Sequence, residues 1–214
     1  MRKILLPLLM LLLSPNIVAQ SKLFNELEYR VEIGASQNSL FYTTGANYTP
    51  VGGQTDYNFI DSYLLPSFQV TTIYPLGEKF ELDIHTSYLV FGGRKEFGDG
   101  NEERQQIKSL GLGVTPSYLI TNQFRIGLIL EDNIVLDAET VVKYMQNTAT
   151  YDETEAHNNH VLRVGLRIDF NFKGFVLAGK YSMTATDLLN DDFFGDLSKT
   201  NNNIGLSLGY RFGK

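Results

Sequence analysis

The stretch Asp83-Ile84-His85-Thr86-Ser87 holds the side chains of this sequence that are best suited to chemistry. If the stretch is a β-strand, residues two positions apart share a face, so Asp83, His85 and Ser87 point the same way. A histidine beside a serine can act as the general base that activates a hydroxyl nucleophile. The same residues also fit a histidine that only hydrogen-bonds Asp83 or another polar neighbour, and we expect this structural role.

Other candidates for metal or thiol chemistry are few. His157 and His160 lie three positions apart in an asparagine-rich segment, and the chain has no cysteine. This pair does not predict a zinc site, and a chain without cysteine has no disulfides or thiolate ligands. The formal net charge is −6 and the basic residues form no stripe, which argues against nucleic acid as a partner. We expect no metal and no cofactor.

Residues 1–20 have the form of a signal peptide. Two basic residues precede an apolar run, 4–13, that is too short to span a bilayer as a helix. Small residues follow it, and we expect cleavage after Ala19 or Gln20, which leaves 21–214 as one domain. No other apolar stretch reaches about 18 residues, so the exported chain could cross a membrane only as a closed β-barrel.

Eight stretches alternate apolar residues with small or polar ones, the period-2 pattern of strands with two different faces. Connections of about four residues alternate with connections of about fifteen or more, as in membrane barrels with short turns at one end. The long connections include a charged segment, 92–106, and an acidic one, 137–159. Pro66 and Pro116 fall within strands, which predicts a bulge at each or a strand end near Pro66. The predicted strands are 27–35, 64–74, 80–90, 110–118, 124–131, 162–170, 175–183 and 204–212.

Charged residues lie on only one face of these strands, together with many glycines that leave room for long side chains in a narrow barrel. A charge without a partner there loses hydration that a partner must replace, so we predict a lumen filled by paired charges. Arg211 should meet the charges of the first strand, and Arg163 and Arg167 should reach Glu131 or an acid across the lumen. The predicted lumen charges are Glu28, Arg30, Glu32, Glu81, Asp83, Arg125, Glu131, Arg163, Arg167, Asp169, Lys180 and Arg211.

Aromatic residues on the apolar face flank every short connection. A soluble barrel with an apolar interior would show the same alternation, but it would not explain these aromatics or the unequal connections. We predict that they form a girdle at one membrane interface. The predicted girdle is Tyr74, Phe80, Tyr118, Phe124, Phe170, Phe175 and Phe212.

Together these features resemble the small eight-stranded outer-membrane barrels, the class of the OmpA membrane domain and OmpX, often described as porin-family proteins. The resemblance implies an all-β, antiparallel, up-and-down transmembrane barrel in the cell outer membrane, with short periplasmic turns and long extracellular loops. The final strand, which ends at Phe212, resembles the strand that the outer-membrane insertion machinery recognises, although Gly213 and Lys214 follow it. The expected state is a monomer in contact with outer-membrane lipid, including lipopolysaccharide.

Three functions are open at this point. The first is a structural or surface-interaction protein with a plugged lumen and acidic loops, at 152–155 and 187–196, that face the outside. The second is a small passive channel, which would require that the charges leave a path. The third is a lipid A-modifying enzyme, because the spacing of His85 and Ser87 is similar to the His-x-Ser of outer-membrane lipid A deacylases. That chemistry needs the pair on the outer wall, whereas the alternation directs both into the lumen. We expect the first function and no enzyme.

Overall fold

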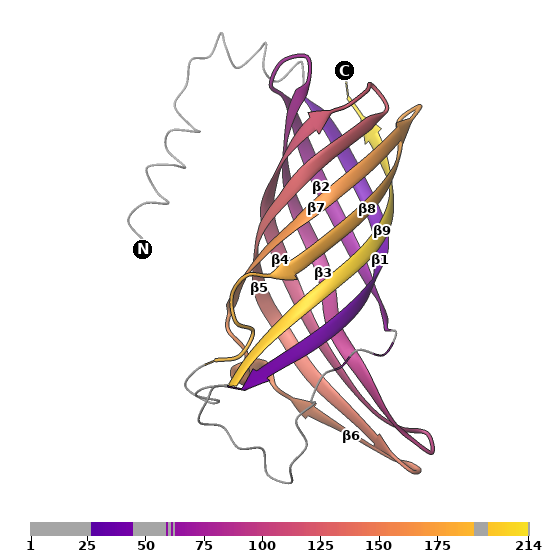
Figure 1. The fold of residues 1–214 in the computed structure, drawn as a ribbon, viewed down its shortest axis with the longest axis vertical. Helices are drawn as coiled ribbons and strands as arrows, with labels where there is room; N and C mark the ends of the chain where they lie inside the picture. Colours follow the sequence, from indigo (N-terminus) through magenta and orange to yellow (C-terminus); the bar gives the residue numbers. More distant parts are fainter. Residues whose placement is uncertain (1–26, 45–58, 60, 62, 191–196, 214) are drawn as a thin grey trace.

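The computed structural model shows a closed antiparallel barrel (Figure 1). It describes residues 27–44, 59, 61, 63–190 and 197–213, so the expected signal peptide and the loop acids at 191, 192 and 196 lie outside the described residues. Each barrel strand pairs with the next one in the ring, and the last pairs with the first, which confirms the predicted eight-stranded up-and-down barrel. The strands are β1 (Glu28–Thr44), β2 (Leu64–Pro75), β3 (Phe80–Gly98), β4 (Asn101–Leu119), β5 (Phe124–Tyr144), β7 (His160–Phe172), β8 (Phe175–Thr184) and β9 (Leu197–Phe212).

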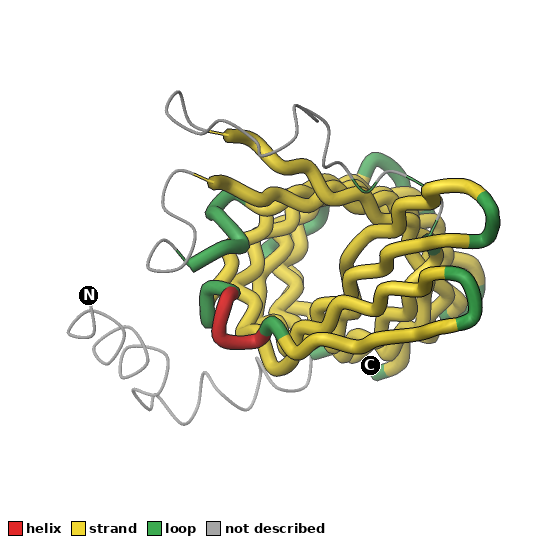
Figure 2. Tube along the Cα trace, turned by 90° about the horizontal axis from the view of Figure 1, so that it is seen from below, coloured by secondary structure: helices red, strands yellow, loops and turns green. Residues whose placement is uncertain are grey.

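The register of the strand pairs fixes the width of the barrel (Figure 2). A path through paired residues that starts at Tyr29 and passes once around the ring returns to β1 at Ser39, ten residues further along. With eight strands, this stagger corresponds to a strand tilt of roughly 40° and an interior just wide enough for side chains. The lumen must therefore be filled by the residues that face it.

Several strands run further than the alternation predicted. The charged segment 92–106 is not a loop, because β3 and β4 continue through it as a hairpin that turns at 98–101. The acidic segment 137–159 contains the end of β5, the strand β6 (Asn147–Asp152) and a short 3-10 turn, η1 (Thr154–Ala156). Both loop predictions are wrong, because the backbone keeps pairing where the alternation of apolar residues stops. We find no helix among the described residues with the length and apolar character needed to cross a membrane.

The two strand prolines are accommodated in different ways. Pro66 pairs with Ala35 of β1, and the ladder to β3 begins one residue later, so Pro66 lies near a strand end as expected. At Pro116, the ladder to β5 omits two pairs but keeps the same register on both sides. The predicted bulge at Pro116 is therefore wrong, and the irregularity in this ladder lies between Lys108 and Ser109. The missing amide of Pro116 removes a hydrogen bond without requiring an inserted residue.

The outward side chains form a continuous apolar zone, which we call the apolar band. On β9, Ile204, Leu206 and Leu208 are each more than half exposed. On β1, the outward positions change from exposed Ile33 to exposed Gln37, so the band ends before the strand does. The prediction that the apolar face lies outside is confirmed.

Beyond the apolar band, the lumen contains an apolar cluster that the sequence reasoning missed. Phe59, from the connection between β1 and β2, enters the lumen and exchanges backbone hydrogen bonds with Leu40 at 2.9 and 3.0 Å. Leu188, from the connection between β8 and β9, joins the same cluster. We call this cluster the outer plug, and its buried members are Leu40, Phe59, Phe91, Ile107, Val135, Ala138, Val161 and Leu188.

Gly93 makes space for the outer plug, which leads to a stability prediction. A Cβ at Gly93 would lie 2.5 Å from the Cβ and 2.8 Å from the carbonyl oxygen of Phe59, whereas a Cβ at Gly179 would meet nothing within 4 Å. Gly93→Ala should therefore cost about 1–3 kcal/mol, and the control Gly179→Ala should stay within about 0.5 kcal/mol of wild type. Urea unfolding of the refolded proteins measures both, and equal stabilities would contradict the packing described here.

Candidate functional site: the charged lumen

The structure places all twelve predicted lumen charges inside the barrel, where we call them the lumen network. Each member lies within 4.0 Å of at least one opposite charge of the same set. Most members are almost fully buried, and Arg30 and Asp83 have no exposed surface. Ions that lose their water in this way are stable only when opposite charges and hydrogen bonds replace it.

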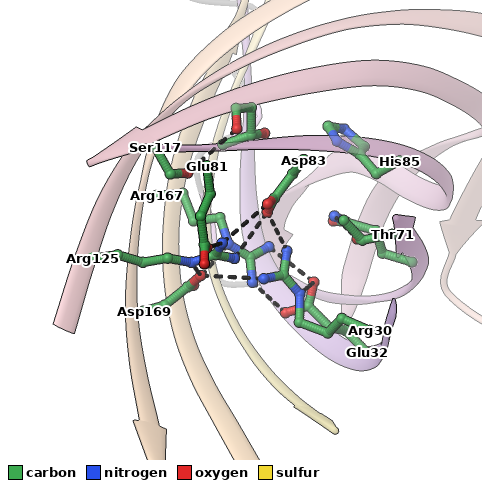
Figure 3. Close-up of polar contacts among 12 residues, drawn as sticks. Arg30, Glu32, Thr71, Glu81, Asp83, His85, Ser117, Arg125, Arg167 and Asp169 are labelled. Carbon is green, nitrogen blue, oxygen red and sulfur yellow. Dashed lines mark hydrogen bonds and ion pairs between the residues drawn. The ribbon is translucent and has the colours of Figure 1, made fainter. Parts of the chain in front are cut away.

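The centre of the lumen network is a pair of shared carboxylates (Figure 3). Asp83 on β3 accepts from Arg30 Nη2 at 2.7 Å and from Arg125 Nη2 at 2.9 Å through the same Oδ2 atom. Asp169 on β7 accepts from Arg125 Nε and lies 3.5 Å from Arg30 Nη1. Arg125 also donates to Glu81 Oε2 at 2.7 Å. Two arginines thus connect acids from opposite sides of the barrel.

Arg167 on β7 makes a two-bonded contact across the lumen to Glu32 on β1. Its Nη1 and Nη2 atoms donate to Oε2 and Oε1 at 2.9 and 2.5 Å, and its Nε donates to Asp169 Oδ1 at 2.7 Å. Arg163 lies further from its acid, with Nη1 at 3.8 Å from Glu131 Oε1. Arg167 therefore forms an ion pair with an acid across the lumen, Glu32, and Arg163 forms one with Glu131 on the neighbouring strand.

Where β9 closes on β1, only one of the expected contacts forms. Arg211 donates to Glu28 of β1 and also to Glu81 of β3, at 2.6 Å. Arg30 does not join them, because it is the direct cross-strand partner of Arg211 and carries the same charge. Arg30 and Glu32 are instead directed to charges deeper in the lumen.

The His85 and Ser87 pair is buried in the lumen and converges on one carboxylate. His85 Nε2 donates to Glu131 Oε2 at 2.9 Å, and Ser87 Oγ donates to the same atom at 2.9 Å. The histidine thus bonds Glu131 and not Asp83, whose oxygens are taken by arginines. Gly113 makes room for this contact, because a Cβ there would lie 2.6 Å from His85 Nε2. The serine hydroxyl is directed to a carboxylate, so the pair is not arranged as base and nucleophile.

The other two histidines do not form a common site. His157 is buried at the end opposite the short turns, where its Nδ1 donates to the carbonyl of Glu153 at 2.8 Å and its Nε2 accepts from Lys199 Nζ at 2.9 Å. His160 points outward and lies 3.0 Å from Asp132. No three His, Asp or Glu side chains within the described ranges gather as metal ligands would.

Lys199 is a buried lumen residue that was absent from the predicted lumen charges. The predicted last strand begins at Ile204, and if its period-2 pattern is continued back to position 199, Lys199 falls on the inward face.

The seven predicted girdle aromatics lie on the outward face, at the strand ends next to the short turns and at the end of β9. Tyr74 is half-buried and the other six are exposed. Phe175 packs edge-on against Tyr210 with ring centroids 5.2 Å apart, and Tyr29 stacks on Phe212 at 6.0 Å. Tyr29 and Tyr210 were absent from the predicted set, because that set contained the aromatic residues that flank the short turns and the last aromatic residue of the final strand.

A double-mutant cycle measures the pairing in the lumen network. Arg167→Met leaves Glu32 buried with its main partner removed, so we expect Arg167→Met and Glu32→Gln to show a coupling free energy of about 2 kcal/mol or more in urea unfolding. The half-exposed pair Lys108 and Asp137, with Nζ 2.6 Å from Oδ2, is the control, and Lys108→Met with Asp137→Asn should couple by less than about 1 kcal/mol. Equal coupling in the two pairs would contradict the account.

Acid should weaken the region around His157. Burial, and after it the charge of Lys199, lowers the pKa of His157 from 6.5 to about 4. Since the unfolded chain takes up this proton at higher pH than the folded chain, stability is present above pH ~6.5 and is lost as pH falls toward ~4. We expect His157 to account for up to about 3 kcal/mol of this loss. The test compares wild type with His157→Gln by urea unfolding between pH ~7 and ~4, and identical pH dependence would contradict it.

Comparisons with known proteins give similarity at the level of the barrel. No protein-family model matches the sequence, and no curated protein matches it. Among solved structures, the chain is similar to Ail, the attachment invasion locus protein of Yersinia pestis, with 15% identity over 86% of this chain and 98% of that one, at a TM-score of 0.48. It is also similar to a major outer membrane protein from Thermus thermophilus, with 12% identity over 87% of this chain and 99% of that one, at a TM-score of 0.49. A third similar structure is Neisserial surface protein A, with 8% identity over 86% of this chain and 97% of that one, at a TM-score of 0.45. At these values the similarities assign no activity to this chain.

Proposed function

We propose that the protein is an outer-membrane β-barrel that acts as a structural or surface-interaction protein and does not conduct solutes. The observation that supports this most directly is that the lumen is occupied at two successive levels. On β1, the inward residues pass from Arg30 and Glu32 of the lumen network to Leu40 of the outer plug. A solute would have to displace paired charges at one level and packed apolar side chains at the other.

The distribution of apolar surface supports a membrane location. The wall exposes large apolar side chains to the outside and buries charges inside, the reverse of a water-soluble protein. On β9, the band covers residues 204–212, which at the tilt of this barrel corresponds to roughly 20 Å of height, close to the apolar band of membrane barrels. Exposed aromatics mark the edge next to the short turns.

The part of the barrel beyond the apolar band offers a surface for a partner. β3, β4, β5 and β6 extend past the rest of the wall as one sheet (Figure 1). All six residues of β6 are exposed, and within the described part of the chain β6 pairs only with β5, so it is the edge of this sheet. Exposed sheet edges can pair with an extended segment of another protein. A surface-interaction role would use this sheet, and outer-leaflet lipopolysaccharide would surround its base.

This proposal includes the route to the membrane. An exported chain would lose residues 1–20, and β9 would present its terminal aromatic residue, Phe212, to the insertion machinery. The monomer is the proposed unit, since the ring closes within one chain. The arrangement of His85 and Ser87 does not support an enzyme, because both side chains are buried in the lumen and bind Glu131.

The orientation can be tested with single cysteines, because the native chain has none. Met145 lies exposed at the turn between β5 and β6, and Lys173 lies exposed in the short turn between β7 and β8. A membrane-impermeant maleimide on intact cells should label Met145→Cys and should label Lys173→Cys only after the outer membrane is permeabilised. Labelling of Lys173→Cys alone on intact cells would reverse the orientation, and equal labelling of both would contradict the membrane location.

A further inference from the structure

The lumen contains an internal cavity of about 50 Å³, which we call the lumen chamber. On β1 it is lined by Glu32 and Ser36, which lie between Arg30 of the lumen network and Leu40 of the outer plug. The charged residues that line it are Glu32, Glu131, Arg163, Arg167 and Lys180.

The chamber walls carry more positive than negative charge. Three bases and two acids line the chamber. The other seven members of the lumen network are four acids and three bases, so the network as a whole is neutral and one positive charge is displaced toward the chamber. His85 also lines the chamber, and its Nδ1 atom has no hydrogen-bond partner among the described residues. An occupant with one negative charge would restore the balance locally.

Arg163 has an N–H group that lacks a hydrogen-bond acceptor among the described residues. Its Nη2 donates to Ser182 Oγ at 2.6 Å, and its Nη1 lies at the long distance of 3.8 Å from Glu131 Oε1. Its Nε has no hydrogen-bond partner among the described residues, although the side chain is buried. A buried N–H without an acceptor is costly, so the side chain needs an acceptor that the described protein atoms do not supply.

Lys180 also has donors to spare, while the carboxylates of the chamber are already occupied. Lys180 Nζ donates to Gln69 Oε1 at 2.8 Å and lies 3.6 Å from Glu32 Oε2. Glu32 accepts two bonds from Arg167. Glu131 accepts from a histidine, a serine and an asparagine. Among the charged side chains of the chamber, donors therefore outnumber the acceptors still available to them, which favours an occupant that accepts hydrogen bonds.

We propose that the lumen chamber binds a small monovalent inorganic anion of the halide class, held by Arg163 and Lys180 with the Ser182 hydroxyl beside them. Such an ion only accepts hydrogen bonds, and its charge offsets the extra base. Water both donates and accepts, so water alone offsets neither the extra base nor the surplus of donors on Arg163 and Lys180. A water-sized particle needs about 10–15 Å³ of cavity volume measured in this way. The chamber therefore has room for a halide and a few waters, but not for an organic anion as large as gluconate.

Bromide provides a direct probe. Crystals of the refolded protein grown with bromide should show an anomalous difference peak in the chamber, within hydrogen-bond distance of Arg163 and Lys180. Arg163→Gln should lose this peak. A chamber that holds only water in the wild type, or a bromide peak that persists unchanged in Arg163→Gln, would overturn the proposal.

Stability gives a second test that does not need crystals of a variant. At equal ionic strength, the wild-type urea midpoint should be higher in sodium chloride than in sodium gluconate, because bound anion favours the folded state. Arg163→Gln should abolish the difference, and if it does not refold, Lys180→Gln should reduce it. The matched control is Arg104→Gln on β4, outside the chamber, which should keep the wild-type difference. Equal wild-type midpoints in the two salts would overturn the proposal.

Discussion

The free-energy cost of burying charge in a narrow barrel is the constraint on which the rest of this structure depends. A stagger of ten residues over eight strands leaves an interior only as wide as its side chains. Charged residues in that interior lose most of their water and must obtain replacement contacts from one another. Asp83 and Asp169 meet this demand by accepting from more than one arginine each. Small residues in the lumen are as necessary as the charged ones, since a Cβ atom at Gly113 would lie 2.6 Å from His85 Nε2.

The two levels of the lumen rest on different physical interactions. Within the apolar band, the wall is apolar outside, and the interior is held by charge pairs. Beyond the band, the outside of the wall becomes polar, as at Gln37, and the interior contains a hydrophobic cluster around Phe91 and Ile107, together with the buried pair Lys199 and His157. The hydrophobic effect can stabilise this second level because its surroundings are aqueous. The same strands thus reverse the placement of polar and apolar residues along their length.

The sequence predicts the eight strands and the inward direction of all twelve charges, because the two faces of a strand follow from backbone geometry. It predicts some of the contacts between these charges, such as those of Arg163, Arg167 and Arg211, but not the others. Arg30 turns away from Arg211 because the register sets them opposite each other, and register depends on pairings around the whole ring. The same limit applies to His85, whose acid is 46 residues away in the chain. The outer plug could not be predicted for another reason. Phe59 lies in the connection between β1 and β2, where no alternation of apolar and polar residues indicates which side chains face the lumen.

The most direct test of the central claim, that the lumen is closed at two levels in series, is single-channel conductance of the refolded protein in planar bilayers. We expect no steady conductance at low voltage from the wild type. Because either level is sufficient to block the path, Phe59→Ala alone and Arg30→Ala with Asp83→Ala should also remain closed, whereas the three changes together should open a measurable path. A steady conductance from the wild type at low voltage would contradict the account and would favour a passive channel.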